Sequence, residues 1–224
     1  MNNASRRAAA TAHELRQPLT SLQLQSQRLL RLLNLYGHRE PTAAASIQAL
    51  AGSAAELNRT IGAMANLMRS AGCDKSAIEL AAVAGSALES LQPRSAAEGV
   101  SCSSSGLKEP LAIHGDPEQL RIACLNLLRN AIEAVQDLPV EQRQVRIQLE
   151  RLGDRACLMV ADSGPGLPDV LAGLLRNGSR KPAGMGLGLF IAHNVSQQHG
   201  GELQAGRSAD LGGAELRLLL PCEP

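Results

Sequence analysis

Three short motifs in the second half of the chain constrain its fold more than any other feature. The first is NLLRN at residues 126–130, a helical run whose two asparagines lie one turn apart and share a face. The second is the turn DSGPG at residues 162–166, which follows an apolar run, and the third is the glycine-rich helix entry GMGLG at residues 184–188. Each motif alone is common, but the three in this order are far more specific.

The first two motifs carry groups that suit a purine nucleotide with its metal. The amide oxygens of Asn126 and Asn130 are hard ligands of the kind that Mg²⁺ accepts. The carboxylate of Asp162 can accept a hydrogen bond from an exocyclic amine, and Gly164 and Gly166 allow backbone to approach a planar ring.

The third motif is suited to phosphate. Gly184, Gly186 and Gly188 lead into a predicted helix, at whose start free N–H groups and the helix dipole bind anions. Between the second and third motifs, the segment 167–183 is a candidate lid. Its Arg180 and Lys181 can reach the β- or γ-phosphate, although a solvated charge pair is an equal alternative.

The order of these motifs resembles the ATP-binding domain of sensor histidine kinases, within the wider group that includes the gyrase, Hsp90 and MutL ATPases. The resemblance implies an α+β two-layer sandwich (the GHKL or Bergerat ATP-binding fold) with ATP between the asparagine helix and a lid. It also implies a role for each motif residue: Mg²⁺ at Asn130 with Asn126 nearby, the adenine amine at Asp162, the adenine wall at Gly164 and Gly166, and a phosphate-contacting hinge at Gly184, Gly186 and Gly188. Glu133 is open to two interpretations, as a metal or water-activating group or as a solvated side chain.

The first 70 residues are predicted to form a helical hairpin. Apolar residues follow a heptad seam over residues 5–36 and again over 43–70, with a break at Gly37–Pro41. One hairpin cannot bury both seams, so we expect a homodimer with a four-helix bundle. A plain coiled-coil stalk is the alternative.

The first of these helices carries the run HELRQPL, beginning at His13. Glu14 can accept a proton from one ring nitrogen and leave the other free to attack phosphorus, while Pro18 bends the helix just beyond. The run resembles the H-box of histidine kinases, especially those of the dicarboxylate-sensor type. That resemblance implies that His13 is the phospho-acceptor and Glu14 its acid/base partner. Gln17 stands where the family often has Thr or Asn, which leaves phosphatase activity toward the regulator open.

The predicted organisation is therefore a dimerisation and phosphotransfer hairpin (1–70), a linker (71–76) and an ATP-binding domain (77–224). Within the last, the patterns predict helices over 77–92, 117–135 and 187–199, the second capped by Asp116, and strands near 100–103, 111–114, 145–152, 156–161, 202–205 and 214–220.

Composition narrows the remaining possibilities. The 224 residues have a net charge of +1 and contain one Tyr, one Phe and no Trp, so the core must be aliphatic and no nucleic-acid partner is expected. The five cysteines have no metal or disulfide spacing, and the four histidines other than His13 are expected to be ordinary surface or cap residues. No run reaches membrane-spanning length, so we expect a cytoplasmic kinase core. If the full protein is a membrane sensor, its membrane part lies outside this chain.

These patterns predict ATP-dependent phosphorylation of His13 and, by the resemblance, transfer of the phosphoryl group to an aspartate in the receiver domain of a response regulator. Two alternatives remain at this point. One is an ATP-driven conformational machine of the gyrase or Hsp90 kind, and the other is a non-catalytic phosphotransfer or scaffold dimer.

Overall fold

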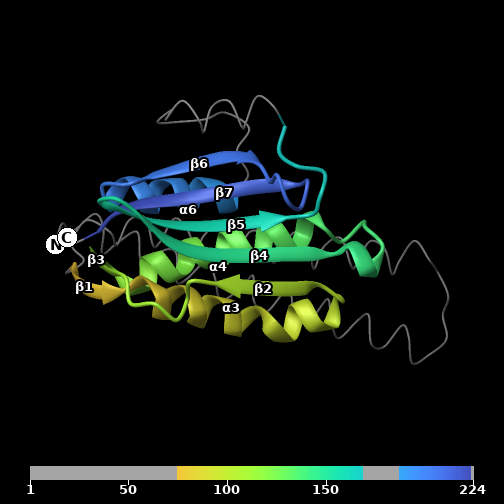
Figure 1. Ribbon diagram of the computed structural model, residues 1–224, viewed down its shortest axis with the longest axis horizontal. Helices are drawn as coiled ribbons and strands as arrows, with labels where there is room; N and C mark the ends of the chain where they lie inside the picture. Colours follow the sequence, from red (N-terminus) through yellow and green to blue (C-terminus); the bar gives the residue numbers. More distant parts are fainter. Residues whose placement is uncertain (1–74, 169–186, 223–224) are drawn as a thin grey trace, which may run out of the picture. The chain divides into compact units, whose positions relative to one another are not determined.

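The computed structural model describes residues 75–168 and 187–222 (Figure 1). The chain divides into two units, Met1–Cys73 and Asp74–Pro224, and every described residue belongs to the second. The predicted helical hairpin lies outside the described residues and stays a prediction.

A five-stranded mixed sheet forms the main layer. Across the sheet, its strands are β2 (Ser101–Ser105), β4 (Gln144–Leu152), β5 (Arg155–Asp162), β7 (Ala214–Pro221) and β6 (Glu202–Arg207). The β2 strand runs parallel to β4, and all other neighbours are antiparallel. A separate two-stranded ribbon pairs β1 (Ser76–Glu79) with β3 (Ala112–Gly115).

Three helices form the second layer: α3 (Leu80–Ala97), α4 (Pro117–Ala134) and α6 (Leu187–Gln198). The α4 helix packs against both α3 and α6, and it also contacts β4 and β5, while α6 contacts β6 and β7 (Figure 1). The predicted α+β class is therefore confirmed for the described part of the chain.

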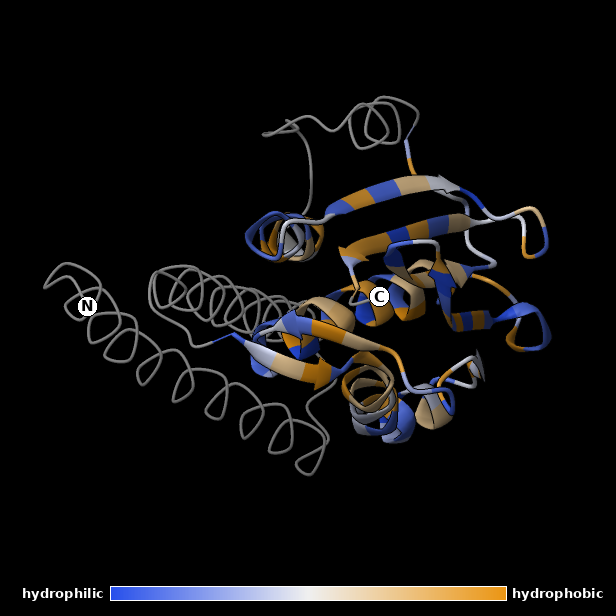
Figure 2. Cartoon of the chain, turned by 60° about the vertical axis from the view of Figure 1, so that its left-hand side comes forward, coloured by the Kyte–Doolittle hydropathy of each residue, from blue (hydrophilic) through white to orange (hydrophobic). Residues whose placement is uncertain are grey.

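The strands alternate between the two faces of the sheet. In β4, Val145, Ile147 and Leu149 are buried, whereas the residues between them are more exposed. Figure 2 shows the same alternation as bands of opposite hydropathy along the strands. This period of two is typical of a sheet with one face against helices and one toward solvent.

The core is aliphatic, as the composition predicts. The largest fully buried side chains are Leu80, Ile113, Leu120, Leu127, Leu128, Ile132, Ile147, Leu158, Leu203, Leu218 and Leu220. They come from helices and strands on both sides of the layer boundary, so the sheet and helices share one core.

The α4 helix begins as predicted. The Asp116 side chain accepts hydrogen bonds from the backbone N–H groups of Glu118 (2.9 Å) and Gln119 (3.1 Å). Pro117 occupies the first helical position, where no hydrogen-bond donor is needed. This cap fixes where the asparagine-bearing helix starts.

The helix predicted over 77–92 differs from the observed α3 at both ends. Ser76–Glu79 forms strand β1, because it pairs with β3 and because the Glu79 carboxylate accepts the Leu111 N–H at 2.8 Å. At the other end, α3 continues through Pro93 to Ala97, with an Arg94–Glu98 ion pair across its last turn. Tertiary contacts thus override the local sequence signals.

Two of the histidines expected to be surface or cap residues are buried: His193 is 3% exposed and His199 6% exposed. The Nε2 atom of His199 accepts the backbone N–H of Asp116 at 3.0 Å. Its Nδ1 therefore carries the proton and donates to the Val195 carbonyl at 2.8 Å. His199 joins the end of α6 to the cap of α4.

Candidate functional site

The asparagines of α4 form the first part of the candidate site. Asn126 and Asn130 are both half-buried, on a helix whose buried positions contribute to the core. The Nδ2 group of Asn126 donates one of its two hydrogens to the Ile122 carbonyl at 2.8 Å, which orients the amide on the helix. Its oxygen is then the group that the side chain presents to a neighbour.

Gly188, in the first turn of α6, lies directly against these two amides. A Cβ atom at Gly188 would stand 3.0 Å from Asn130 Oδ1 and 3.2 Å from Asn126 Oδ1. A side chain here would be tighter against the two amides than most Cβ contacts, so the amides would have to shift by a few tenths of an ångström. The structure therefore brings the first motif and the end of the third together.

Asp162 ends β5 and is 4% exposed. Its Oδ1 atom accepts the backbone N–H groups of Gly164 (2.8 Å) and Ala214 (3.1 Å). Burial raises the pKa of Asp162, and these two hydrogen bonds oppose that rise only in part. The carboxylate is thus fixed in orientation by one of its oxygens.

Two close contacts, at Gly164 and Gly213, position the turn that follows Asp162. A Cβ atom at Gly164 would lie 2.7 Å from the carbonyl oxygen of Ala134, the last residue of α4. A Cβ at Gly213 would overlap the Asp162 carbonyl and carboxylate and stand 2.6 Å from Gly164 N. Gly166 has φ +87°, in the left-handed region that glycine readily adopts. Backbone contacts therefore seat the turn between α4 and β7.

Ser163 ties the same turn to the start of β4. Its hydroxyl donates to the Gln142 carbonyl at 2.6 Å and accepts the Gln144 N–H at 3.0 Å. The backbone N–H of Ser163 also donates to the Gln144 carbonyl at 3.1 Å. The turn is therefore held on both sides.

Asn126, Asn130 and Gly188 lie at one end of this arrangement, and Asp162 with its turn lies at the other. The last turn of α4 connects them, since Asn130 precedes Ala134 by one helical turn. The site offers amide oxygens for a hard cation and a fixed carboxylate for a hydrogen-bond donor. This combination suits an amino-purine nucleotide bound with a divalent cation.

Several predicted site residues lie outside the described residues, and their roles stay predictions. They are His13, Glu14, Gln17, Arg180, Lys181, Gly184 and Gly186.

The sequence motifs did not identify Gly213 or Arg94 as part of the site's surroundings. Gly213 abuts Asp162 and Gly164, and its only sequence signal is the Gly212-Gly213 pair before the last strand. Arg94 pairs with Glu133 from another helix. Neither contact is local in sequence, so no motif spacing could reveal it.

The described residues also bear on three other features: clusters of metal ligands, membrane-spanning helices and cysteine thiols. Within it, no group of three His, Cys, Asp or Glu side chains is placed to hold a metal ion, and no helix is both long and apolar enough to cross a bilayer. Cys102, Cys124, Cys157 and Cys222 are free thiols, and burial raises the pKa of Cys124 to about 12.

Comparison with known proteins gives related proteins for nearly the whole chain. A family model described as "Histidine kinase-, DNA gyrase B-, and HSP90-like ATPase" matches residues 115–224. The sensor histidine kinase ZraS of Klebsiella oxytoca is 30% identical over 220 residues, which cover 96% of this chain and 45% of ZraS. The C4-dicarboxylate transport sensor protein DctS of Rhodobacter capsulatus is 28% identical over 219 residues, covering 96% of this chain and 33% of DctS. The chain thus spans less than half the length of these curated relatives.

A solved structure extends the comparison to the fold. The mycobacterial sensor histidine kinase MprB aligns with a TM-score of 0.54 and 27% identity, over 67% of this chain and 99% of the MprB chain. The whole of that structure therefore corresponds to about two thirds of this chain.

Proposed function

Because residues 115–224 belong to the histidine kinase-, gyrase B- and HSP90-like ATPases, and the chain is related along most of its length to sensor histidine kinases, we propose that it is the kinase core of a two-component sensor. In this proposal, the site on α4, α6 and the Asp162 turn binds Mg-ATP. The γ-phosphoryl group then passes to a ring nitrogen of His13 and afterwards to an aspartate of a response regulator.

The observation that carries the proposal is the contact of Gly188 with both asparagines, together with the contact of Gly164 with the end of the same helix. These contacts join three motifs that are separated in sequence into one site. Asp162, held by Gly164 N and Ala214 N, supplies the fixed acceptor that adenine requires. A purely structural helix pair would need neither a glycine against two amides nor a buried carboxylate.

Magnesium fits the residues present. The half-buried Asn130 offers an amide oxygen, with that of Asn126 close to the same glycine, and Mg²⁺ prefers oxygen ligands while keeping water and phosphate in its shell. We expect Asn130 to hold the ion. When bound, it would neutralise charge on the phosphates, and the chain would supply position.

The acceptor half of the reaction rests on the sequence. We propose that His13 attacks the γ-phosphorus, that Glu14 takes the proton from the other ring nitrogen, and that the leaving group is ADP. The amide of Gln17 could orient a water, which leaves phosphatase activity toward the regulator open. The homodimer, the four-helix bundle and the cytoplasmic location belong to the same proposal.

Incubation with γ-labelled Mg-ATP tests the function. We expect label on the protein that is stable to base and lost in acid, as a phosphorus–nitrogen bond is. The His13→Gln variant should acquire none while binding nucleotide as the parent does, and Asn130→Ala should lose both label and affinity.

The same experiment separates the alternatives. A conformational ATPase, which the wider family includes, would release labelled phosphate and leave His13 unmodified. A scaffold would bind no nucleotide at all. Either result would contradict the kinase proposal.

A further inference from the structure

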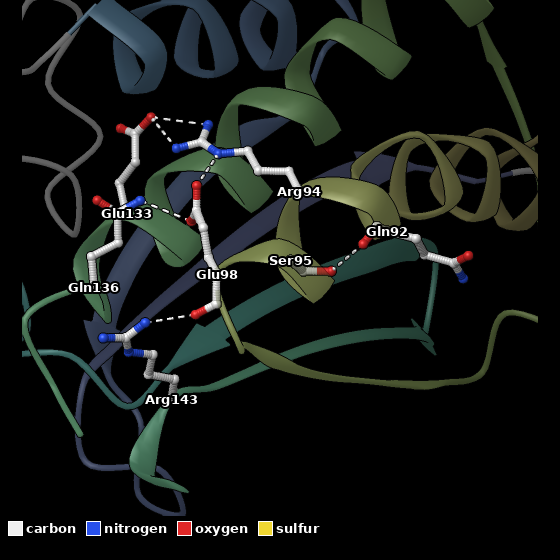
Figure 3. A network of polar contacts seen from close by, with 7 residues as sticks. All are labelled: Gln92, Arg94, Ser95, Glu98, Glu133, Gln136 and Arg143. Atoms are coloured by element: carbon white, nitrogen blue, oxygen red, sulfur yellow. Dashed lines mark hydrogen bonds and ion pairs between the residues drawn. The ribbon is translucent and has the colours of Figure 1, made fainter. Parts of the chain in front are cut away.

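Arg94, near the end of α3, holds the Glu133 carboxylate on α4 (Figure 3). Its Nη1 and Nη2 groups both donate to Glu133 Oε1 at 3.3 Å. Its Nε donates to Glu98 Oε1 at 2.8 Å. The guanidinium group therefore bridges two carboxylates, one on its own helix terminus and one on the asparagine helix.

The bridge is itself held in place. Glu98 accepts a second hydrogen bond, from Gln136 Nε2 at 2.8 Å, and its backbone carbonyl accepts from Arg143 Nη1 at 2.6 Å. Burial alone would raise the pKa of Glu98, but the hydrogen bonds from Arg94 and Gln136 bring it below its usual value. Arg94 is thus positioned by a network that joins the end of α3 to the segment after α4 (Figure 3).

Glu133 lies on the asparagine face of α4. It follows Asn130 by three residues and Asn126 by seven, which places it within about 60° and about 20° of them around the helix axis. The next residue, Ala134, is the one whose carbonyl meets Gly164. A negative side chain, 40% exposed, therefore stands on the face that would receive an anionic nucleotide.

We propose that Arg94 is a positioning residue of the nucleotide site, which keeps the Glu133 carboxylate paired and turned from the phosphates of ATP. This inference rests on the proposed function. Without Arg94, the site would lose one positive charge beside this carboxylate, and the added Coulomb repulsion toward a polyanion, at a solvent-screened distance, would weaken binding about five- to tenfold.

The test measures binding of two ligands to the full chain by titration calorimetry. One is a non-hydrolysable ATP analogue with Mg²⁺, and the other is adenosine, which has no phosphate. We expect Arg94→Gln to weaken the analogue about five- to tenfold and adenosine by less than about twofold, more so at low salt. The double variant Arg94→Gln/Glu133→Gln should recover the parent affinity, because the repelling charge is gone.

Two further variants guard against a merely structural effect. Arg94→Lys keeps the charge and should bind the analogue nearly as the parent does. Arg121→Gln removes a similarly exposed arginine from α4, which pairs with the nearby Glu118 in the part of the chain that the structure describes, and should change neither affinity.

Three outcomes would overturn the inference. Arg94→Gln could bind the analogue as the parent does, it could lose adenosine as strongly as the analogue, or the double variant could remain as weak as the single one. Either of the last two results would mean that Arg94 only joins helix α3 to helix α4 and does not position Glu133 relative to the phosphates. Failure of nucleotide binding, on which the proposed function depends, would look different, since the parent itself would bind neither ligand and both proposals would fall together. Failure of the kinase step alone would appear in the labelling of His13 and would leave these affinities unchanged.

Discussion

Asp162 uses one carboxylate oxygen in the fold, and the proposed contact with adenine would use the other. One oxygen, Oδ1, accepts from Gly164 N and Ala214 N, so it secures the turn to β7. Adenine would need the remaining acceptor capacity of the carboxylate. The raised pKa of Asp162, caused first by burial, means that the charged form is costly in the folded state.

The Asp162→Asn variant separates these two roles. Its amide oxygen can still accept both backbone N–H groups, so the free energy of unfolding should stay within about 1 kcal/mol of the parent. The other atom becomes an N–H₂ donor, which faces the exocyclic amine of adenine, so ATP affinity should fall at least about tenfold. Urea denaturation and calorimetry measure the two quantities. In contrast, Asp162→Ala should lose both stability and ATP affinity, because it leaves the N–H groups of Gly164 and Ala214 without their acceptor. Parent-like ATP binding by Asp162→Asn would contradict the proposed contact between Asp162 and adenine.

His199 predicts a pH-dependent stability. Burial lowers its pKa below the usual 6.5, with Lys75 lowering it further and the Val195 hydrogen bond and Asp116 opposing. Above 6.5 the ring is neutral in both states and its hydrogen bonds contribute fully. Between 6.5 and the lower folded-state pKa, the unfolded chain takes up the proton first, so the free energy of unfolding declines as pH falls.

Replacement by an amide checks this effect. The free energy of unfolding of the parent should fall between about pH 7.5 and about pH 5. At the higher pH, His199→Gln should be less stable than the parent by about 1–3 kcal/mol. On acidification, the free energy of unfolding of His199→Gln should decrease less than that of the parent. Urea titrations at the two pH values measure this. Parallel pH dependences in the two proteins would show that His199 is not responsible.

At the scale of elements, the sequence correctly predicts those helices and strands that depend on local periodicity. The α4 helix, its Asp116 cap and the β4–β5 hairpin lie where their patterns place them, within a residue or so. The β1 strand was missed, because it is stabilised by residues 112–115, far along the chain. The parallel pairing of β2 with β4 is equally non-local.

For the candidate site, too, the sequence predicts what depends on local pattern and does not predict what depends on packing. Its motif residues could be selected from the sequence, because side-chain chemistry and spacing identify them. The packing that makes them one site could not, since it depends on Gly164 meeting Ala134 and Gly213 meeting Asp162. Those contacts join the end of a helix, a turn and the start of β7, and no local pattern encodes them.

The residue before β7, Gly213, packs closely against the turn that follows Asp162, so a larger residue at this position should destabilise the fold. In Gly213→Ala, the new methyl group would overlap backbone atoms of Asp162 and Gly164, which cannot rotate away. We expect a loss of about 1–3 kcal/mol in the free energy of unfolding, together with weaker ATP binding. Gly206→Ala in β6 is the matched control, because nothing lies within 4 Å of its added Cβ, and it should stay within about 0.5 kcal/mol. Equal stabilities of the two variants would show that the turn adapts.

At the scale of the whole molecule, the second unit contains the described sheet, the three described α-helices and the candidate nucleotide site. The proposed acceptor, His13, belongs to the first unit. Binding and transfer are therefore assigned to different units of one chain. If that assignment is right, the two functions can be separated physically.

A fragment of residues 74–224 provides that separation. A domain of this length with one continuous aliphatic core should unfold cooperatively and bind ATP as the full chain does. It should not label itself, because it lacks His13. Added to the full chain carrying Asn130→Ala, it should label that chain at a rate proportional to its own concentration, since the encounter is then bimolecular. Loss of ATP binding in the fragment alone would mean that residues of the first unit complete the pocket, and label on the fragment itself would mean that the acceptor is not His13.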